Sequence, residues 1–191
     1  MIRAALMSAA LLAAPAFADD AEDFADLIAD FEAHELANSP IRAGREGDLD
    51  AAARWPDVSP ESALEDEAAE AAFLERLEAI NVDALATNDQ VSHAVLDYVL
   101  RFRVELAPFD MERMSFTNDS GFFTTPTYTA ASVRPRNTEE AEAWIERLNG
   151  VWDYFEANAE WLESGIEDGF TQPSYILPGV MEQIRTIAES S

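Results

Sequence analysis

The segment of the sequence closest to a metal-binding motif is His34-Glu35-Leu36-Ala37-Asn38. It begins like the zinc-helix signature, in which two His residues one turn apart bind the metal and the Glu activates water. Asn38 stands where the second His is needed. The sequence has one other His and no Cys, and a catalytic zinc held by carboxylates alone is unusual. We therefore assign no metal ligand and no cofactor to this chain, and we expect His34 to be an ordinary surface residue.

Motifs for nucleophilic catalysis and phosphate binding are also missing from the sequence. Ser120 occurs in Asp119-Ser120-Gly121, without the Gly-x-Ser-x-Gly turn that presents a catalytic serine. No Gly-rich phosphate-binding loop is found. With 38 Asp and Glu residues, a pair of carboxylates with glycosidase-like spacing would arise by chance. We predict no catalytic residue in this chain.

The elements around these residues are helical by their periodicity. Residues 20–36 carry apolar side chains at i, i+3, i+4 and i+7, which is typical of one helical face: Phe24, Leu27, Ile28 and Phe31. The polar segment from Ile41 to Trp55 is expected to be a loop. A second helix begins at Ser59-Pro60-Glu61, where a hydroxyl cap precedes Pro at the first helical position. Its inner stripe is expected to be Leu64, Ala68, Ala71, Leu74 and Leu77.

The third expected helix, from Asn88 to Leu106, has apolar residues on two sides. One stripe consists of Val91, Val95, Tyr98, Val99, Phe102 and Leu106, and the second consists of Leu96, Leu100 and Val104. A helix that is apolar on two faces is packed on two faces. His93 lies near the second stripe, and we interpret it as a buried, hydrogen-bonded structural residue.

Residues 107–137 change in composition, because Pro, Thr, Ser and aromatic residues replace the Ala/Glu pattern. Long non-helical inserts in compact helical proteins are often functional. We therefore predict that this insert lines a cleft, through Phe116, Asn118, Ser120, Phe122 and Phe123. Asn137 to Glu140 then fits a capping box. It begins a fourth helix whose inner stripe is expected to contain Trp144, Leu148, Val151, Phe155, Ala159 and Leu162. A last helix is predicted to begin at Pro178.

The predicted fold is mainly α: a layered bundle of four to five helices with an irregular or short-stranded aromatic insert. Residues 1–18 have the order of a secretory signal, with Arg3, an apolar run and Ala16-Phe17-Ala18 before the cut. The alternative is an uncleaved membrane anchor, although the apolar run is about half of the ~20 residues that a span needs. We predict a periplasmic or secreted protein in which residues 19–191 form a single helical domain.

The charge of the chain is strongly negative. Asp and Glu number 38 against 12 basic residues, all of them Arg, which gives a formal charge of −26. Nucleic acids and anionic membranes bind through clustered cations, so neither is an expected partner after the signal is removed. The acidic surface attracts cationic ligands or, on the second interpretation, keeps an exported protein soluble.

Several short segments occur in the order and spacing of a known family. They are Ser39-Pro40, Trp55 to Pro60, the Leu74-x-x-Leu77-x-x-Ile80 stripe, Asp119 to Phe122, Arg134 to Glu140, Trp144 to Leu148, and Gly165 to Pro173. The ordered set resembles the N-terminal part of the bacterial domain-of-unknown-function 885 family. The resemblance implies a large helical protein similar to zinc metallopeptidases of the gluzincin type. It places the His/Glu metal motif, and the zinc, in the C-terminal part of longer relatives, so no ligand or catalytic residue is carried over.

Two functional hypotheses follow. The leading one is the periplasmic N-terminal helical segment of a zinc metallopeptidase-like protein, inactive alone, whose insert walls a substrate cleft. The alternative is a stand-alone helical binding or interaction protein whose aromatic insert holds a peptide, a small molecule or a partner protein. On the first hypothesis, apolar surface left uncovered by the C-terminal part of the longer relatives predicts self-association.

Overall fold

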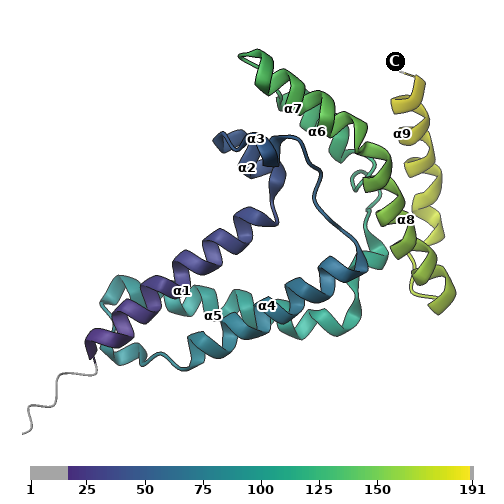
Figure 1. Ribbon diagram of the computed structural model, residues 1–191. Coiled ribbons are helices and arrows are strands. Elements are labelled where there is room, and N and C mark those ends of the chain that lie inside the picture. Colours follow the sequence, from purple (N-terminus) through teal and green to yellow (C-terminus); the bar gives the residue numbers. More distant parts are fainter. Residues whose placement is uncertain (1–16, 190–191) are drawn as a thin grey trace, which may run out of the picture.

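A computed structural model describes residues 17–189, and the described part is helical almost throughout (Figure 1). The helices are α1 (Phe17–Ala37), α2 (Pro40–Glu46), α3 (Leu49–Ala52), α4 (Pro60–Glu78), α5 (Thr87–Leu106), α6 (Thr125–Ser132), α7 (Thr138–Asn149), α8 (Val151–Asp168) and α9 (Leu177–Glu189). Within residues 17–189, β pairing is limited to one bridge between Phe116 and Gly121. The mainly α prediction is confirmed, but four to five helices was too low a number. Most of the predicted signal lies outside the described residues.

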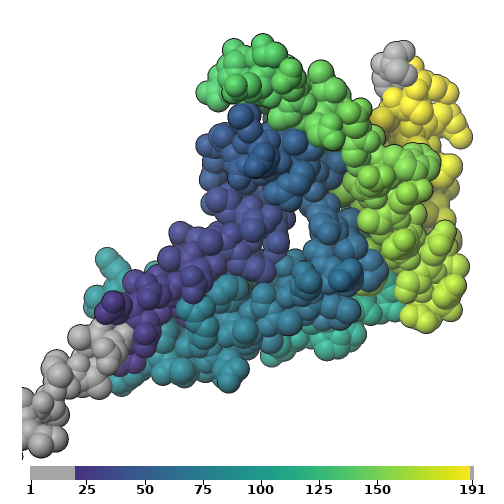
Figure 2. Space-filling view, viewed as in Figure 1, coloured from purple at the N-terminus to yellow at the C-terminus, as the bar shows by residue number. Residues whose placement is uncertain are grey.

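The helices form two groups. Figure 1 shows α1, α4 and α5 side by side, with α6 to α9 in a second group and α2 and α3 between α1 and α7. Figure 2 shows an opening bounded by α1 and by the stretch that leads into α4. No helix in the described range is long and apolar enough to cross a membrane. The main core lies in the first group and contains Phe24, Leu27, Phe73, Leu77, Ile80, Leu85, Leu96 and Leu100.

Helix α5 packs on one face only, which corrects the expectation of two packed faces. Leu96 and Leu100 are buried in the core, whereas Val95 and Tyr98 on the other face are 59% and 71% exposed. The exposed face also includes Val91 and Phe102. Helical periodicity identifies apolar faces but does not say whether a partner covers each face.

The prediction of His93 as a structural residue is confirmed. Its side chain is buried, and its Nε2 atom lies 3.1 Å from the carbonyl oxygen of Leu77. The expected inner stripe of α4 was wrong for its first three residues. Leu64 is 66% exposed, Ala68 and Ala71 are also exposed, and Phe73 is buried instead. Phe73 buries far more apolar surface than the alanines that defined the expected stripe, and that burial sets the rotation of the helix.

The segment from Ile41 to Trp55 was expected to be a loop, and this was wrong. It forms α2 and α3. Asp48 is the N-cap of α3, and its carboxylate accepts from Ala51 N–H at 2.9 Å. A Cβ atom added at Gly44 would lie 2.7 Å from the α3 backbone, so glycine allows the two helices to touch. Gly47 ends α2 in the left-handed conformation, with φ of 111°. Short helices with few apolar residues give no periodic signal.

The fourth expected helix is divided at Gly150 into α7 and α8. Its predicted start is confirmed, because the Asn137 side chain accepts from Glu140 N–H at 2.8 Å. Glu140 reaches one residue further back than a capping box requires, and accepts from Arg136 N–H at 2.8 Å. The buried face is rotated from the expected stripe, and most of its side chains carry a polar group. The buried residues are Arg147, Tyr154, Asn158, Trp161 and Gly165.

Candidate functional site

The arginines of the described chain fall into two classes. Seven of them lie within 4 Å of a carboxylate oxygen: Arg42, Arg76, Arg101, Arg103, Arg113, Arg136 and Arg185. The other four described arginines form no ion pair: Arg45, Arg54, Arg134 and Arg147. In a chain with 38 acidic residues, unpaired arginines in one region require an explanation.

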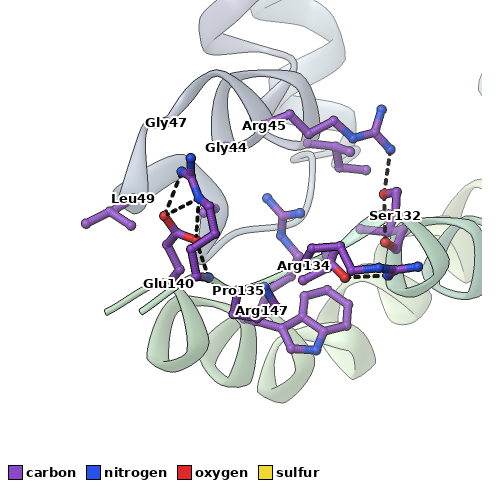
Figure 3. A pocket seen from close by; sticks show the side chains of 15 residues that line it. Gly44, Arg45, Gly47, Leu49, Ser132, Arg134, Pro135, Glu140 and Arg147 are labelled. Carbon is purple, nitrogen blue, oxygen red and sulfur yellow. Dashed lines mark hydrogen bonds and ion pairs between the residues drawn. The ribbon is translucent and has the colours of Figure 1, made fainter. Parts of the chain in front are cut away.

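Three of these unpaired arginines line one pocket between α2–α3 and α6–α7, and the fourth lies close by. The pocket has a volume of about 250 Å³. Figure 3 shows Arg147 between Arg45 and Ser132 on one side and Glu140 on the other. Arg45 donates to Ser132, and Arg136 pairs with Glu140. The lining includes four arginines and a single carboxylate, that of Glu140. The pocket is therefore cationic inside a protein of charge −26.

Arg147 is the buried member of the set, with 3% of its surface exposed. Its Nη2 atom donates to the carbonyl oxygens of Ala51 at 2.7 Å and Pro40 at 3.1 Å, so it ties α7 to α2 and α3. Its Nε atom is buried without an acceptor. Its Nη1 atom also donates to no atom of the described residues. Two carbonyl groups satisfy part of the guanidinium but do not neutralise its charge.

The position of Arg147 is fixed by the aromatic residues around it. The indole N–H of Trp55 donates to the Arg147 carbonyl oxygen at 2.6 Å, and the guanidinium carbon lies 5.7 Å from the Trp55 ring centroid. Trp55 stacks in turn on Tyr154 of α8, with ring centroids 5.3 Å apart. A cation near an indole face gains about 0.5–2 kcal/mol, which compensates part of its lost hydration.

The electrostatics of the pocket favour a negative ligand. Burial, and then the charges of Arg45 and Arg54, lower the pKa of Arg147 below its ordinary value. The guanidinium nevertheless stays protonated, since arginine begins far above neutral pH. A buried charge without a counter-ion is costly, so an anion in the pocket would be stabilised. The Glu140 carboxylate is paired with Arg136 and not with Arg147, because its oxygens accept from the Arg136 guanidinium. These hydrogen bonds lower the pKa of the Glu140 carboxyl and keep it ionised.

The arginines at the rim are held in different ways. Arg45 donates to the Ser132 hydroxyl at 2.9 Å, and this contact joins α2 to the end of α6. Arg134 donates only to the neighbouring Val133 carbonyl oxygen, at 2.6 Å, and is exposed. Both guanidiniums keep unused N–H groups. They could therefore turn towards an anion bound at Arg147.

The five residues predicted to line a cleft lie elsewhere, at a turn that packs on α8 and α9. Phe122 makes an edge-to-face contact with Phe155 of α8, and Phe123 is buried. The Phe116 carbonyl oxygen accepts from Gln172, and the Asn118 carbonyl oxygen from Gln183. The fifth residue, Ser120, lies 3.1 Å from the hydroxyl of Thr117. None of the five lines the cationic pocket, and their role in a cleft stays a prediction.

The His residues do not form a metal site in the described part of the chain. His34 was expected to be an ordinary surface residue, but it is half-buried, close to the Asp66 carboxylate and 5.4 Å from the Phe73 ring. Asn38 donates to the same carboxylate. Among residues 17–189, no three His, Cys, Asp or Glu side chains are grouped so that they could hold a metal ion. These residues do not fit the zinc that the resemblance implies for longer relatives.

Comparison with known proteins identifies the family. Residues 40–191 match the family described as "Bacterial protein of unknown function (DUF885)". The chain belongs to this family. Searches of curated proteins and of solved structures gave no match. The matched part of the DUF885 protein includes every residue that lines the cationic pocket.

The sequence contains one signal for this pocket. Arg147 lies on the apolar side of its helix, between Trp144 and Val151, where a charged residue is out of pattern. Its partners in the DUF885 protein are distant in sequence, with Pro40 107 residues away and Ala51 96 residues away. No local pattern connects such residues, so the pocket could not be assembled from the sequence.

Proposed function

We propose that this chain is a ligand-binding helical segment of a DUF885 protein, and that its cationic pocket holds an anionic group of the ligand. The observation that carries the proposal is Arg147, which is buried, has no carboxylate partner and has a buried Nε without an acceptor. Buried charges in proteins are normally paired. A ligand anion is the counter-ion that this guanidinium lacks.

The chain contributes binding and not chemistry in this proposal. The resemblance to gluzincin-type metallopeptidases assigns hydrolysis and zinc to the C-terminal part of longer relatives. The pocket is a wall of the substrate cleft, and it replaces the aromatic insert as the main binding surface. Its two walls come from α2–α3 and from α6–α7, so ligand binding also fastens these elements to each other.

The proposal includes export, which is supported by the signal-like order of residues 1–18. Mass spectrometry of the protein from its native host is expected to find Asp19 as the first residue. Recovery of the chain with Met1 intact in the cytoplasm would show that the export part of the proposal is wrong, without bearing on the pocket.

Anion binding is tested by thermal denaturation of the purified chain at constant ionic strength, with sodium acetate replacing sodium chloride. A ligand that binds only the folded state stabilises it by RT ln(1 + [L]/Kd), so Tm is expected to rise with acetate concentration. Arg147→Met should remove this rise. The matched control is Arg185→Met, which removes an exposed arginine of α9 that pairs with Glu182.

Three outcomes would refute the proposal. The first is an acetate response no larger than that of chloride in the unaltered chain. The second is an acetate response that persists in Arg147→Met, which would place the anion elsewhere. The third is a response lost equally in Arg147→Met and Arg185→Met, because it would reflect total charge rather than this pocket.

A further inference from the structure

The pocket has an apolar side as well as a cationic one. Beside the arginines, the lining contains Ile41, Leu49, Val133, Pro135 and Trp144. Leu49 is 40% exposed and Trp144 is half-buried, so the protein leaves apolar surface of both uncovered at the pocket. A bare sulfate or phosphate would leave this surface in contact with water, whereas an organic anion would cover it.

The indole N–H of Trp144 is also unused. The N–H groups of Trp55 and Trp161 donate to carbonyl oxygens at 2.6 and 2.7 Å. That of Trp144 donates to no atom of the described residues. An amphipathic ring that lines a pocket offers an apolar face and a polar edge to the same ligand.

The donors of the pocket favour a carboxylate over a phosphate. Phosphate sites are typically built from free backbone N–H groups, in a nest or at a helix start. Here four backbone N–H groups at or beside the pocket already have acceptors. The N–H groups of Gly47 and Asp48 donate to helix carbonyls, that of Val133 donates to Thr129, and that of Arg136 donates to Glu140. The charged donors that remain are guanidiniums, whose planar fork matches a planar carboxylate.

We infer that the natural ligand of the pocket presents a carboxylate attached to a small apolar or aromatic group. The carboxylate lies at Arg147, within reach of Arg45 and Arg134, and the apolar group covers Trp144 and Leu49. The volume of about 250 Å³ is below the usual range for drug-sized ligands, so the pocket takes one small group and not an extended molecule. This inference rests on the proposed function and names the ligand class for the same site.

Calorimetric titration of the full chain with four probes tests the inference: acetate, phenylacetate, phenylacetamide and inorganic phosphate. Burial of about 60 Å² of apolar ligand surface corresponds to about tenfold in affinity. Phenylacetate is therefore expected to bind at least tenfold more tightly than acetate. Phenylacetamide, which has the ring without the charge, and phosphate, which has the charge without the ring, should both bind more weakly than phenylacetate.

Two variants connect the preference to the apolar wall. Trp144→Leu should weaken phenylacetate binding more than acetate binding, and so reduce the preference for phenylacetate. Leu49→Ala alters an exposed side chain with little risk to folding, and should reduce the same preference to a smaller extent. If neither variant changes the ratio of the two affinities, the ring does not lie on this wall and the inference is wrong.

The outcomes separate this inference from the proposed function. Phosphate binding as tight as that of phenylacetate, or equal binding of acetate and phenylacetate, would overturn the ligand class while the anion pocket stands. Tight binding of phenylacetamide would show that the charge is not recognised. Failure of all three anions to bind would overturn both proposals.

Discussion

Replacement of Arg147 by Met tests whether this guanidinium serves the fold or a ligand. Met has similar length and is apolar, so it can fill the buried space over Trp55 without bringing a charge. The change removes the two hydrogen bonds to the Pro40 and Ala51 carbonyl oxygens. The Ala51 carbonyl oxygen keeps a second donor, the Arg54 N–H at 3.1 Å.

The magnitude follows from two opposing terms. Hydrogen bonds that involve a charged group contribute about 1.5–3 kcal/mol each, so the loss of two costs about 3–6 kcal/mol. An uncompensated buried ion carries a penalty of several kcal/mol, and Arg147→Met removes it. Because the terms nearly cancel, we expect the free energy of unfolding without ligand to change by less than about 2 kcal/mol.

The measurement is urea denaturation followed by far-ultraviolet circular dichroism, in chloride buffer without organic anions. Arg185→Met is the control for the loss of one positive charge at the surface. A loss of more than about 4 kcal/mol in Arg147→Met would refute the reasoning. Such a loss would mean that the carbonyl groups and Trp55 already compensate the buried charge. Arg147 would then be a structural link between α7 and α2–α3, with no uncompensated charge for a ligand to bind.

Three further predictions concern the fold and the pocket wall. Only one face of α5 is packed, so Leu100→Ala should lower the free energy of unfolding by about 2–5 kcal/mol and Val95→Ala by less than about 0.5 kcal/mol. Urea denaturation measures both values. Equal losses would show that the outer face is covered in solution. Hydrogen bonding to Arg103 lowers the pKa of Glu35 below 4.5. The unaltered chain should therefore be more stable than Glu35→Gln above about pH 4.5, and this difference should disappear as the pH falls further. A difference in unfolding free energy that does not change with pH would contradict this. Gly44→Ala places a Cβ atom 2.7 Å from the α3 backbone and should lower both Tm and the acetate response; an unchanged acetate response would mean that the α2–α3 contact does not shape the pocket.

Local signals in the sequence predicted helix ends well. Ser59 and Pro60 begin α4, and Asn137 caps α7, because hydroxyl and amide caps act within three residues of their partners. Gly169 ends α8 in the left-handed conformation with φ of 73°. Such contacts depend on neighbours in the chain, so a single sequence contains them in full.

Packing partners could not be predicted in the same way. The two apolar stripes of α5 are equivalent in sequence, and only the position of α1 and α4 decides that Leu100 is buried and Val95 is not. The pocket is a stronger case, since Arg147 meets its partners across about a hundred residues. The unusual composition of the aromatic insert predicts a site there, whereas the strongest candidate site consists of separate arginines in helices and loops.

The contrast between a cationic pocket and a molecule of charge −26 has a kinetic consequence. An approaching anion is repelled by the acidic surface. The arginines attract it only within about one Debye length, which is about 8 Å in physiological salt. Added salt therefore speeds association by screening the repulsion, and it also speeds dissociation by screening the contact. Polyanions meet a barrier that grows with each charge, while a small monoanion meets a low one. On the proposed function, the acidic surface therefore selects ligands by their total charge before the pocket distinguishes them by shape.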